Sequence, residues 1–168
     1  MPEAPAGGTI DQLDARLLLL LADEPRIGVL ECSRRLGVAR GTVQARLDRL
    51  QRRGVVRGFG PEVDPAALGY GVTAFVTLEI RQGQGHAPVA EHLSQVPEVL
   101  ELHTITGAGD LLCRIVARSN ADLQRVIDEV VSDEHILRAS THIALSAPVP
   151  YRVLPLVARS LGGRTGVS

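Results

Sequence analysis

The apolar residues of this chain follow two different spacings. Up to residue 54 they recur every three or four positions, as at Leu13, Leu17 and Leu20, which places them on one face of an amphipathic helix. Between residues 72 and 80 apolar and polar residues alternate instead, which is the period of a half-buried strand. The chain is therefore predicted to begin with helices and to continue with a sheet.

The first helix is predicted to run from about Thr9 to Asp23. Thr9 and Gln12 have the spacing of a capping box, in which each side chain satisfies a free backbone N–H of the first turn. Pro25 follows at the place where a proline commonly ends a helix.

Two shorter helices follow, joined by a tight turn. The second is predicted to start after Gly28 and to end at Leu36, because Gly37 stands where a left-handed residue often closes a helix. The third follows Ala39 and ends before Gly54. The residues expected to face inward on the third helix are Val43, Leu47 and Leu50. Two short helices across a tight turn, with a third helix in front, have the layout of a helix-turn-helix.

Beyond residue 54 the pattern predicts a fold that contains both strands and helices. Residues 55–59 are predicted to form a short strand, and the stretch 61–69, with two prolines, is typical of a linker. The elements predicted after the linker are strands at 72–80, 99–105, 111–117 and 136–145 and helices at 89–96 and 120–131. The order βαββαβ is that of a ferredoxin-like α+β sandwich.

These elements divide the 168 residues into two small domains. The predicted division is a flexible tail at 1–8, a helix-turn-helix domain at 9–60, a linker at 61–69, a second domain at 70–157 and a C-terminal tail at 158–168. A domain of about 60 residues is only marginally stable alone. We therefore expect the first domain to be supported by the second or by a partner subunit.

Positive charge is concentrated in the helix-turn-helix, although the whole chain has a formal net charge of −1. Between Arg34 and Arg57 there are eight arginines and a single acidic residue, Asp48, whereas acidic residues outnumber arginines after residue 60. A basic segment on a nearly neutral chain indicates a polyanionic partner. Arginine is also common on solvated helix faces, so the charge alone leaves both interpretations open.

Several classes of protein are not expected from this composition. The apolar run Leu17–Ala22 is far below the roughly 20 residues that cross a bilayer, and Met1–Gly8 lacks the features of a secretion signal. Cys32 and Cys113 have no metal-ligand spacing and are expected to be reduced thiols of a cytoplasmic protein. No catalytic or metal-binding arrangement is evident, so neither a cofactor nor a metal is expected. With two Phe, two Tyr and no Trp, the chain also lacks a base-stacking platform for single strands.

Three stretches of the sequence resemble the Lrp/AsnC family, the feast/famine regulators. Residues 10–18, with Arg26 and Ile27, resemble the first helix and the entry to the second; residues 36–56 resemble the helix-turn-helix core; residues 106–112 resemble the glycine-and-aspartate loop of the ligand domain. The resemblance covers residues 9–157 approximately. It implies a winged helix-turn-helix followed by an α+β domain of the RAM type, in dimers that assemble into octamers.

The third helix is the part expected in the major groove of duplex DNA. The residues left near the bases, once the apolar face is buried, are Arg40, Gly41, Gln44 and Ala45. Arginine suits guanine, glutamine suits adenine and the alanine methyl suits thymine. The residues better placed for phosphates are Thr42, Arg46, Arg49 and Arg52. For Arg46 a structural ion pair with Asp14 or Glu31 is the alternative.

The start of the third helix departs from the family pattern. The family usually has serine where this chain has Ala39, and alanine cannot cap a helix, at a cost of about 1 kcal/mol. Gly41 in the first turn costs about another 1 kcal/mol relative to alanine. We therefore expect this end of the helix to be frayed until DNA orders it.

The loop Gly107–Asp110 has two interpretations. By spacing alone it is an ordinary tight hairpin between two strands, and it lacks the third glycine and the helix of a dinucleotide-binding loop. The resemblance implies instead that the loop, with Ala108 and Gly109, holds an amino acid or related effector at a subunit interface, where Asp110 pairs with an ammonium group. Neighbouring strand residues expected to line the same pocket are Glu101, His103, Ser140, Thr141 and His142.

The function expected from these observations is regulation of transcription. The chain is predicted to bind a specific sequence of duplex DNA, to respond to a small effector and to form dimers or larger homo-oligomers. Two alternatives are a siroheme-decarboxylase-like enzyme, whose family shares the fold, and an amino-acid sensor that has no affinity for DNA.

Overall fold

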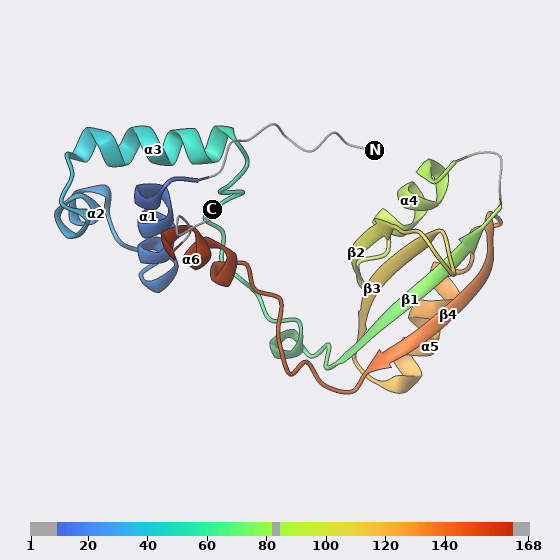
Figure 1. The fold of residues 1–168 in the computed structure, drawn as a ribbon. Coiled ribbons are helices and arrows are strands. Elements are labelled where there is room, and N and C mark those ends of the chain that lie inside the picture. Colours follow the sequence, from blue (N-terminus) through green and yellow to red (C-terminus); the bar gives the residue numbers. More distant parts are fainter. Residues whose placement is uncertain (1–9, 82–84, 163–168) are drawn as a thin grey trace. The chain divides into compact units, whose positions relative to one another are not determined.

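The computed structural model describes residues 10–81 and 85–162, which form two compact units (Figure 1). Unit 1 takes the chain up to Pro61 and again from Pro150, and unit 2 takes Glu62–Val149. The helices are α1 (Gln12–Asp23), α2 (Val29–Leu36), α3 (Arg40–Arg52), α4 (Ala87–Ser94), α5 (Asn120–Val130) and α6 (Leu154–Gly162). The strands are β1 (Val72–Ile80), β2 (Val99–Thr104), β3 (Leu111–Ala117) and β4 (Ile136–Ala144). None of the described helices is long and apolar enough to cross a membrane.

Helix α1 begins later than the sequence predicts. Its N-cap is Asp11, whose side chain accepts from the Asp14 N–H at 2.9 Å, while Asp14 accepts from the Asp11 N–H at 3.3 Å. This reciprocal pair is a capping box of two aspartates, three residues apart. Thr9, the expected start, lies outside the described residues. The capping box of the described helix is thus Asp11–Asp14, and aspartate is among the strongest N-cap residues.

Helices α2 and α3 form the predicted helix-turn-helix. Gly28 caps α2, and Gly37 closes it in the left-handed conformation with φ of 70°. Helix α3 follows after Ala39. The three helices bury a common apolar core made of Leu17, Cys32, Leu36, Val43, Leu47 and Leu50. The inward face predicted for α3 is thus confirmed.

The strand predicted at residues 55–59 does not form. Gly54 reverses the chain with φ of 68°, and the N–H groups of Val55 and Val56 both donate to the Leu50 carbonyl, at 2.9 and 3.2 Å. These donors close the end of α3, so they are not available for a strand ladder. The β-branched residues that suggested a strand here instead end the helix.

Unit 2 is the ferredoxin-like α+β fold that the sequence predicts. Its strands pair antiparallel in the order β2-β3-β1-β4, and α4 and α5 pack on one face of this sheet. That face carries the buried residues of the alternating strand β1, such as Val76 and Leu78. The opposite face carries Thr73, Phe75, Thr77 and Glu79, since successive side chains of a strand point to opposite sides. We call it the open face, because both described helices of the sheet lie on the other side.

Helix α6 was not expected from the sequence. It belongs to unit 1 and packs beside α1. The boundary predicted after residue 157 falls inside this helix, and Pro150 rather than residue 158 is where the chain leaves unit 2. The apolar residues of α6 follow a helical spacing, but its face is partly exposed, with Leu156 at 63%. That weak burial explains why the segment resembles a tail in sequence.

Candidate functional site

One face of α3 is exposed along the first half of the helix. The exposed residues here are Arg40, Gly41, Thr42, Gln44 and Ala45. They alternate with Val43 and Leu47, which are 1% and 8% exposed. Burial of the apolar face therefore presents to solvent the residues predicted to approach bases.

The start of α3 has the weak cap that its sequence suggests. Ala39 makes no side-chain capping bond, and its carbonyl accepts from the N–H groups of Thr42 and Val43 at 3.0 and 3.3 Å. Gly41 lies in the first turn with open space around it. Among the described residues no side chain accepts a hydrogen bond from the Arg40 or Gly41 N–H group.

The exposed polar residues of α3 differ in their partners. Arg40 and Arg52 have no ion pair within the part of the chain that is described. Gln44 donates from Nε2 to Asp48 Oδ1, 2.9 Å away and one turn later on the same helix. The side chains of these two arginines are thus available to bind a ligand. The Gln44 amide must first break its hydrogen bond to Asp48 before it can reach a base.

Arg46 and Arg49 turn back to α1 instead. Arg46 Nη1 donates to Asp14 Oδ1 at 2.9 Å and to Asp11, and Arg49 Nη2 donates to Asp14 Oδ2 at 2.7 Å. The bond from Arg46 lowers the pKa of the Asp11 carboxyl, and Asp11 in return raises the pKa of the Arg46 guanidinium. The structural alternative considered for Arg46 is therefore present, with Asp14 as the partner.

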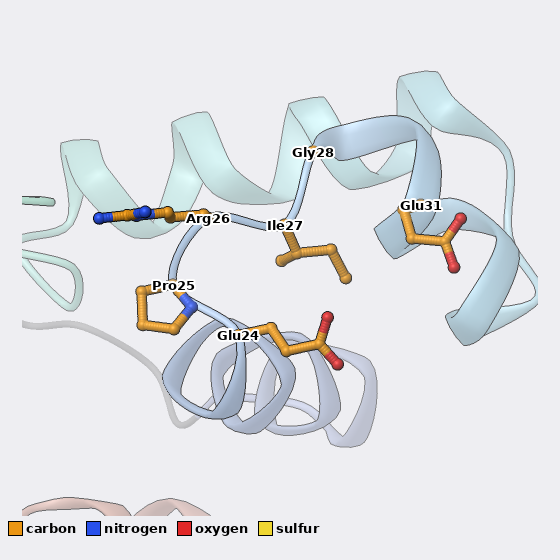
Figure 2. A pocket seen from close by; sticks show the side chains of 6 residues that line it. All are labelled: Glu24, Pro25, Arg26, Ile27, Gly28 and Glu31. Carbon is orange, nitrogen blue, oxygen red and sulfur yellow. The ribbon is translucent and has the colours of Figure 1, made fainter.

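Glu31, the other acid considered for Arg46, has different partners. It lies 3.6 Å from Arg34 and 3.3 Å from Arg35, measured between carboxylate oxygen and guanidinium nitrogen. With Glu24 and Ile27 it borders an open hollow of about 500 Å³ between α1 and α2, where the side chains of Glu24 and Ile27 lie toward one another while Arg26 extends away (Figure 2). Both carboxylates pair with Arg35. None of the predicted site residues lines this hollow.

The loop Gly107–Asp110 is bound tightly to the end of β1. The Asp110 N–H donates to the Leu78 carbonyl at 2.9 Å, and Asp110 Oδ2 accepts from the Ile80 N–H at 2.8 Å. A Cβ on Gly109 would stand 2.3 Å from Thr77 Cγ2, so only glycine fits there. One oxygen of Asp110 is thus engaged in the hairpin, while Oδ1 accepts no hydrogen bond among the described residues.

The other predicted effector residues lie on different strands of the sheet. Glu101 and His103 are on the edge strand β2, and Ser140 and His142 are on the edge strand β4. The register places all four on the open face, because Glu101 aligns through Arg114 and Phe75 with His142, and His103 aligns through Leu112 and Thr77 with Ser140.

This arrangement separates the predicted pocket into parts. Three strand spacings separate β2 from β4, which is about 14 Å. Gly109 and Ser140 are each neighbours of Thr77, Gly109 beside its side chain and Ser140 as its register partner on β4. Thr141 pairs with Val76 and so belongs to the helix-covered side. Within one chain, the residues on β2 and β4 do not converge on one small ligand.

Two residues of the open face were missed in the sequence analysis. Phe75 is 40% exposed at the centre of the sheet, and Arg114 beside it has a buried Nε for which no described atom accepts a hydrogen bond. Arg114 Nη1 lies 3.8 Å from Glu101 Oε1, which is too long for a hydrogen bond. The signal was available: Phe75 is the apolar exception on the polar side of an alternating strand.

The cysteines and the potential metal ligands among the described residues indicate no further site. Cys32 and Cys113 are both free thiols, and burial raises the pKa of the Cys113 thiol to about 11. No cluster of three or more His, Cys, Asp or Glu within residues 10–81 and 85–162 has the arrangement to hold a metal ion.

Comparison with known proteins assigns both units. Residues 10–57 match the family model of winged helix-turn-helix DNA-binding domains, and residues 73–154 match that of the Lrp/AsnC ligand binding domain. The HTH-type transcriptional regulator FL11 of Pyrococcus furiosus is 30% identical over 149 residues, which cover 89% of this chain and 98% of that protein.

Solved structures show the same architecture. That of Escherichia coli AsnC has a TM-score of 0.81 and 26% identity, covering 88% of this chain and 99% of its own. The complex of NMB0573 from Neisseria meningitidis with L-Met shares the fold, with a TM-score of 0.74, 24% identity and coverage of 85% and 94%. The family resemblance predicted from the sequence is confirmed, and this chain belongs to the Lrp/AsnC family of DNA-binding transcriptional regulators.

Proposed function

We propose that this regulator recognises a specific sequence of duplex DNA through the exposed face of α3. The observation that carries the proposal is the separation of that helix into a buried apolar face and a face that presents Arg40, Gln44 and Ala45. Side chains of this kind can read base edges in the major groove. Arg52 is exposed at the other end of the helix. It binds a phosphate and so fixes the position of the protein on the duplex without reading sequence.

The test is a gel shift of the full chain with genomic fragments at several salt concentrations. At least one fragment is expected to stay bound in the presence of excess random duplex. Its affinity is expected to fall linearly on logarithmic axes as salt rises, because bound arginines release counterions from phosphates. If no fragment is preferred over random duplex at any salt concentration, the proposal fails and the sensor without DNA affinity is favoured.

The effector in this proposal is an amino acid. The family model for unit 2 is that of a ligand binding domain, and the neisserial protein of the same fold was solved with L-Met. Asp110 Oδ1 accepts an ammonium group, and the glycines of the loop allow backbone N–H groups to approach a carboxylate. Because the candidate residues on β2 and β4 lie apart, the site is completed by a second subunit.

A thermal-shift screen with the twenty amino acids tests the effector. An amino acid at about 100 times its dissociation constant adds about 2.7 kcal/mol to stability and so raises Tm. The Asp110→Asn variant keeps the acceptor for Ile80 and loses the charge, so the shift is expected to shrink in it. If no amino acid raises Tm, the effector is of another class.

Self-association through the open face of unit 2 completes the proposal. Phe75 on that face is 40% exposed, and Arg114 Nε is buried without a hydrogen-bond acceptor among the described residues, although buried polar groups are normally hydrogen-bonded. A two-fold dimer places two recognition helices about one DNA turn apart, and further assembly gives octamers. Sedimentation equilibrium is expected to give a mass at least twice that of the chain; a single 17.9 kDa species at micromolar concentration would contradict it.

The proposed regulator has no catalytic reaction and acts on DNA in the cytoplasm. The enzyme alternative, a decarboxylase of siroheme-type substrates, has a distinct signature. Purified protein that carries a visible tetrapyrrole absorption band would support that alternative, and a colourless preparation that binds a DNA fragment would exclude it as the main role.

A further inference from the structure

Asp14 is the most deeply buried charged residue among the described residues of unit 1. Its side chain is 1% exposed, yet it accepts from Arg46 Nη1 at 2.9 Å and from Arg49 Nη2 at 2.9 and 2.7 Å. A buried carboxylate is tolerated only when it is fully paired, because removal of the charge from water is costly. Asp14 on α1 therefore needs a cationic partner, and Arg46 and Arg49 of α3 both pair with it.

This pairing restricts how α3 can lie on α1. The apolar contacts of Val43, Leu47 and Leu50 are non-directional, so they tolerate small rotations and shifts of the helix. Guanidinium–carboxylate bonds have a fixed geometry. Arg46 and Arg49 stand three residues apart, almost one helical turn, and both reach the same carboxylate. The rotation of α3 about its own axis is thereby determined.

The same pairing also removes two arginines from the phosphate contacts expected from the sequence. If Arg46 or Arg49 turned to a phosphate, Asp14 would lose a bond that it needs in its buried position. The exposed arginines Arg40 and Arg52 pair with no carboxylate among the described residues. The division of α3 into DNA-facing and α1-facing arginines follows from these partners.

Resting on the proposed DNA-binding function, we propose that Asp14 is a positioning residue for DNA recognition. It sets the orientation in which α3 presents Arg40 and Gln44, and it keeps Arg46 and Arg49 away from the phosphates. Arg46 and Arg49 therefore add nothing to the salt dependence of binding, although they lie on the recognition helix.

The experiment compares Asp14→Asn with Asp23→Asn in the full chain. Asp23 lies on the same helix and is exposed, without an ion pair in the described structure, so its variant controls for loss of one acidic charge. Binding is measured by fluorescence anisotropy on the fragment selected by gel shift and on random duplex, each at several salt concentrations. Circular dichroism melts report the folded fraction of each variant.

Asp14→Asn is expected to lower the preference for the selected fragment over random duplex by about 10- to 100-fold, the size of losing one or two base contacts. On random duplex the salt dependence is expected to steepen by about one phosphate contact, because Arg49 loses its hydrogen bonds to a carboxylate and can reach the backbone, whereas Arg46 keeps Asp11. Simple loss of folded protein would reduce binding to both DNAs equally and leave the slope unchanged. Asp23→Asn is expected to change neither quantity.

A second variant covers the case in which Asp14→Asn does not fold. Arg49→Gln leaves Arg46 on Asp14, and it is expected to leave the salt slope on random duplex unchanged. A slope that falls by about 0.9, the loss of one phosphate contact, would overturn the proposal. So would an Asp14→Asn protein that folds and keeps the wild-type preference. If wild-type protein prefers no fragment, the DNA-binding function itself has failed, and the two failures are distinguishable.

Discussion

At the scale of single residues, partners decide which arginines are available to DNA. Arg40 and Arg52 are exposed and unpaired within the described structure, whereas Arg46 and Arg49 are held by Asp14. All four are identical in type and lie on one helix, so no count of positive charge separates them. The roles of the two free arginines differ by position: Arg40 is at the helix start, near the bases, and Arg52 is at its end.

Arg40→Ala and Arg52→Ala are predicted to weaken DNA binding in different ways. Arg40→Ala is expected to cost about 1–3 kcal/mol on the selected fragment and to relax the sequence preference at one position. Arg52→Ala is expected to weaken binding to every duplex alike and to reduce the salt slope by about one contact. Anisotropy titrations on selected and random duplex check both. Equal effects of the two variants on both DNAs would contradict the assigned roles.

Gly109→Ala is predicted to destabilise unit 2. The added Cβ would meet Thr77 Cγ2 at 2.3 Å and the Leu78 carbonyl oxygen at 3.2 Å, so the hairpin must shift from β1. Overpacking of this kind costs about 1–3 kcal/mol. Denaturant melts measure the loss, and Thr77→Ser, which removes the Cγ2 methyl, is expected to recover part of it in the double variant. A Gly109→Ala protein of wild-type stability would show that the loop is not held as described.

At the scale of elements, α3 combines a firm middle with a weak start. Val43, Leu47 and Leu50 anchor it in the core, and Asp14 anchors it by charge. Its first turn has only Ala39 as N-cap and contains Gly41. The part of the helix expected to meet bases is therefore the part with the fewest contacts of its own, which lets DNA complete its order.

Ala39→Ser is predicted to stabilise the start of α3. Serine at an N-cap contributes about 1 kcal/mol relative to alanine. Hydrogen exchange of free protein is expected to show weak protection of the amides at residues 40–43 in wild type and stronger protection in the variant. Strong protection in wild type would refute the frayed start. Ser33→Ala, within α2, serves as a control for changes elsewhere in unit 1.

The sequence predicted most elements, and its errors have local causes. Strands β1 and β3 match their predicted ranges, because alternation and flanking turns specify both ends. The predicted strand at 55–59 failed because Val55 and Val56 bond to Leu50, a contact that propensity does not reveal. The start of α1 was placed too early, since Thr9–Gln12 and Asp11–Asp14 both have capping-box spacing.

The candidate sites were less predictable than the fold. Helical periodicity identified the exposed side of α3, but the bonds from Arg46 and Arg49 to Asp14 join residues more than thirty positions apart. Similarly, the order of the strands along the chain did not indicate that β2 and β4 form opposite edges of the sheet. Local pattern determines which side of an element is buried, and only the tertiary structure determines which elements meet.

At the scale of the whole molecule, the open face carries an acid and a base side by side. Glu101 and Arg114 are register partners on β2 and β3, and they are 3.8 Å apart without a hydrogen bond. In a two-fold interface each surface meets its own copy. An acid and a base on one face can therefore pair across the interface in both directions.

A charge-swap experiment tests whether the open face joins two subunits. Glu101→Arg and Arg114→Glu are each expected to dissociate the dimer, because like charges then face each other across the interface as well as within the chain. A mixture of the two variants is expected to form heterodimers, since each acid then meets a base of the other subunit. Native mass spectrometry distinguishes these species by mass. If the mixture stays dissociated while the wild type is dimeric, the pair does not span the interface.

Unit 1 is discontinuous in the chain, because α6 joins it from beyond Pro150. A premature stop codon at that point would therefore leave the sheet complete. It would remove the helix that packs beside α1 in the DNA-binding unit. For the same reason the sheet unit is inserted into the helical one rather than appended to it. To express the DNA-binding unit alone, two segments that are distant in sequence must be joined, because a single truncation leaves that unit incomplete.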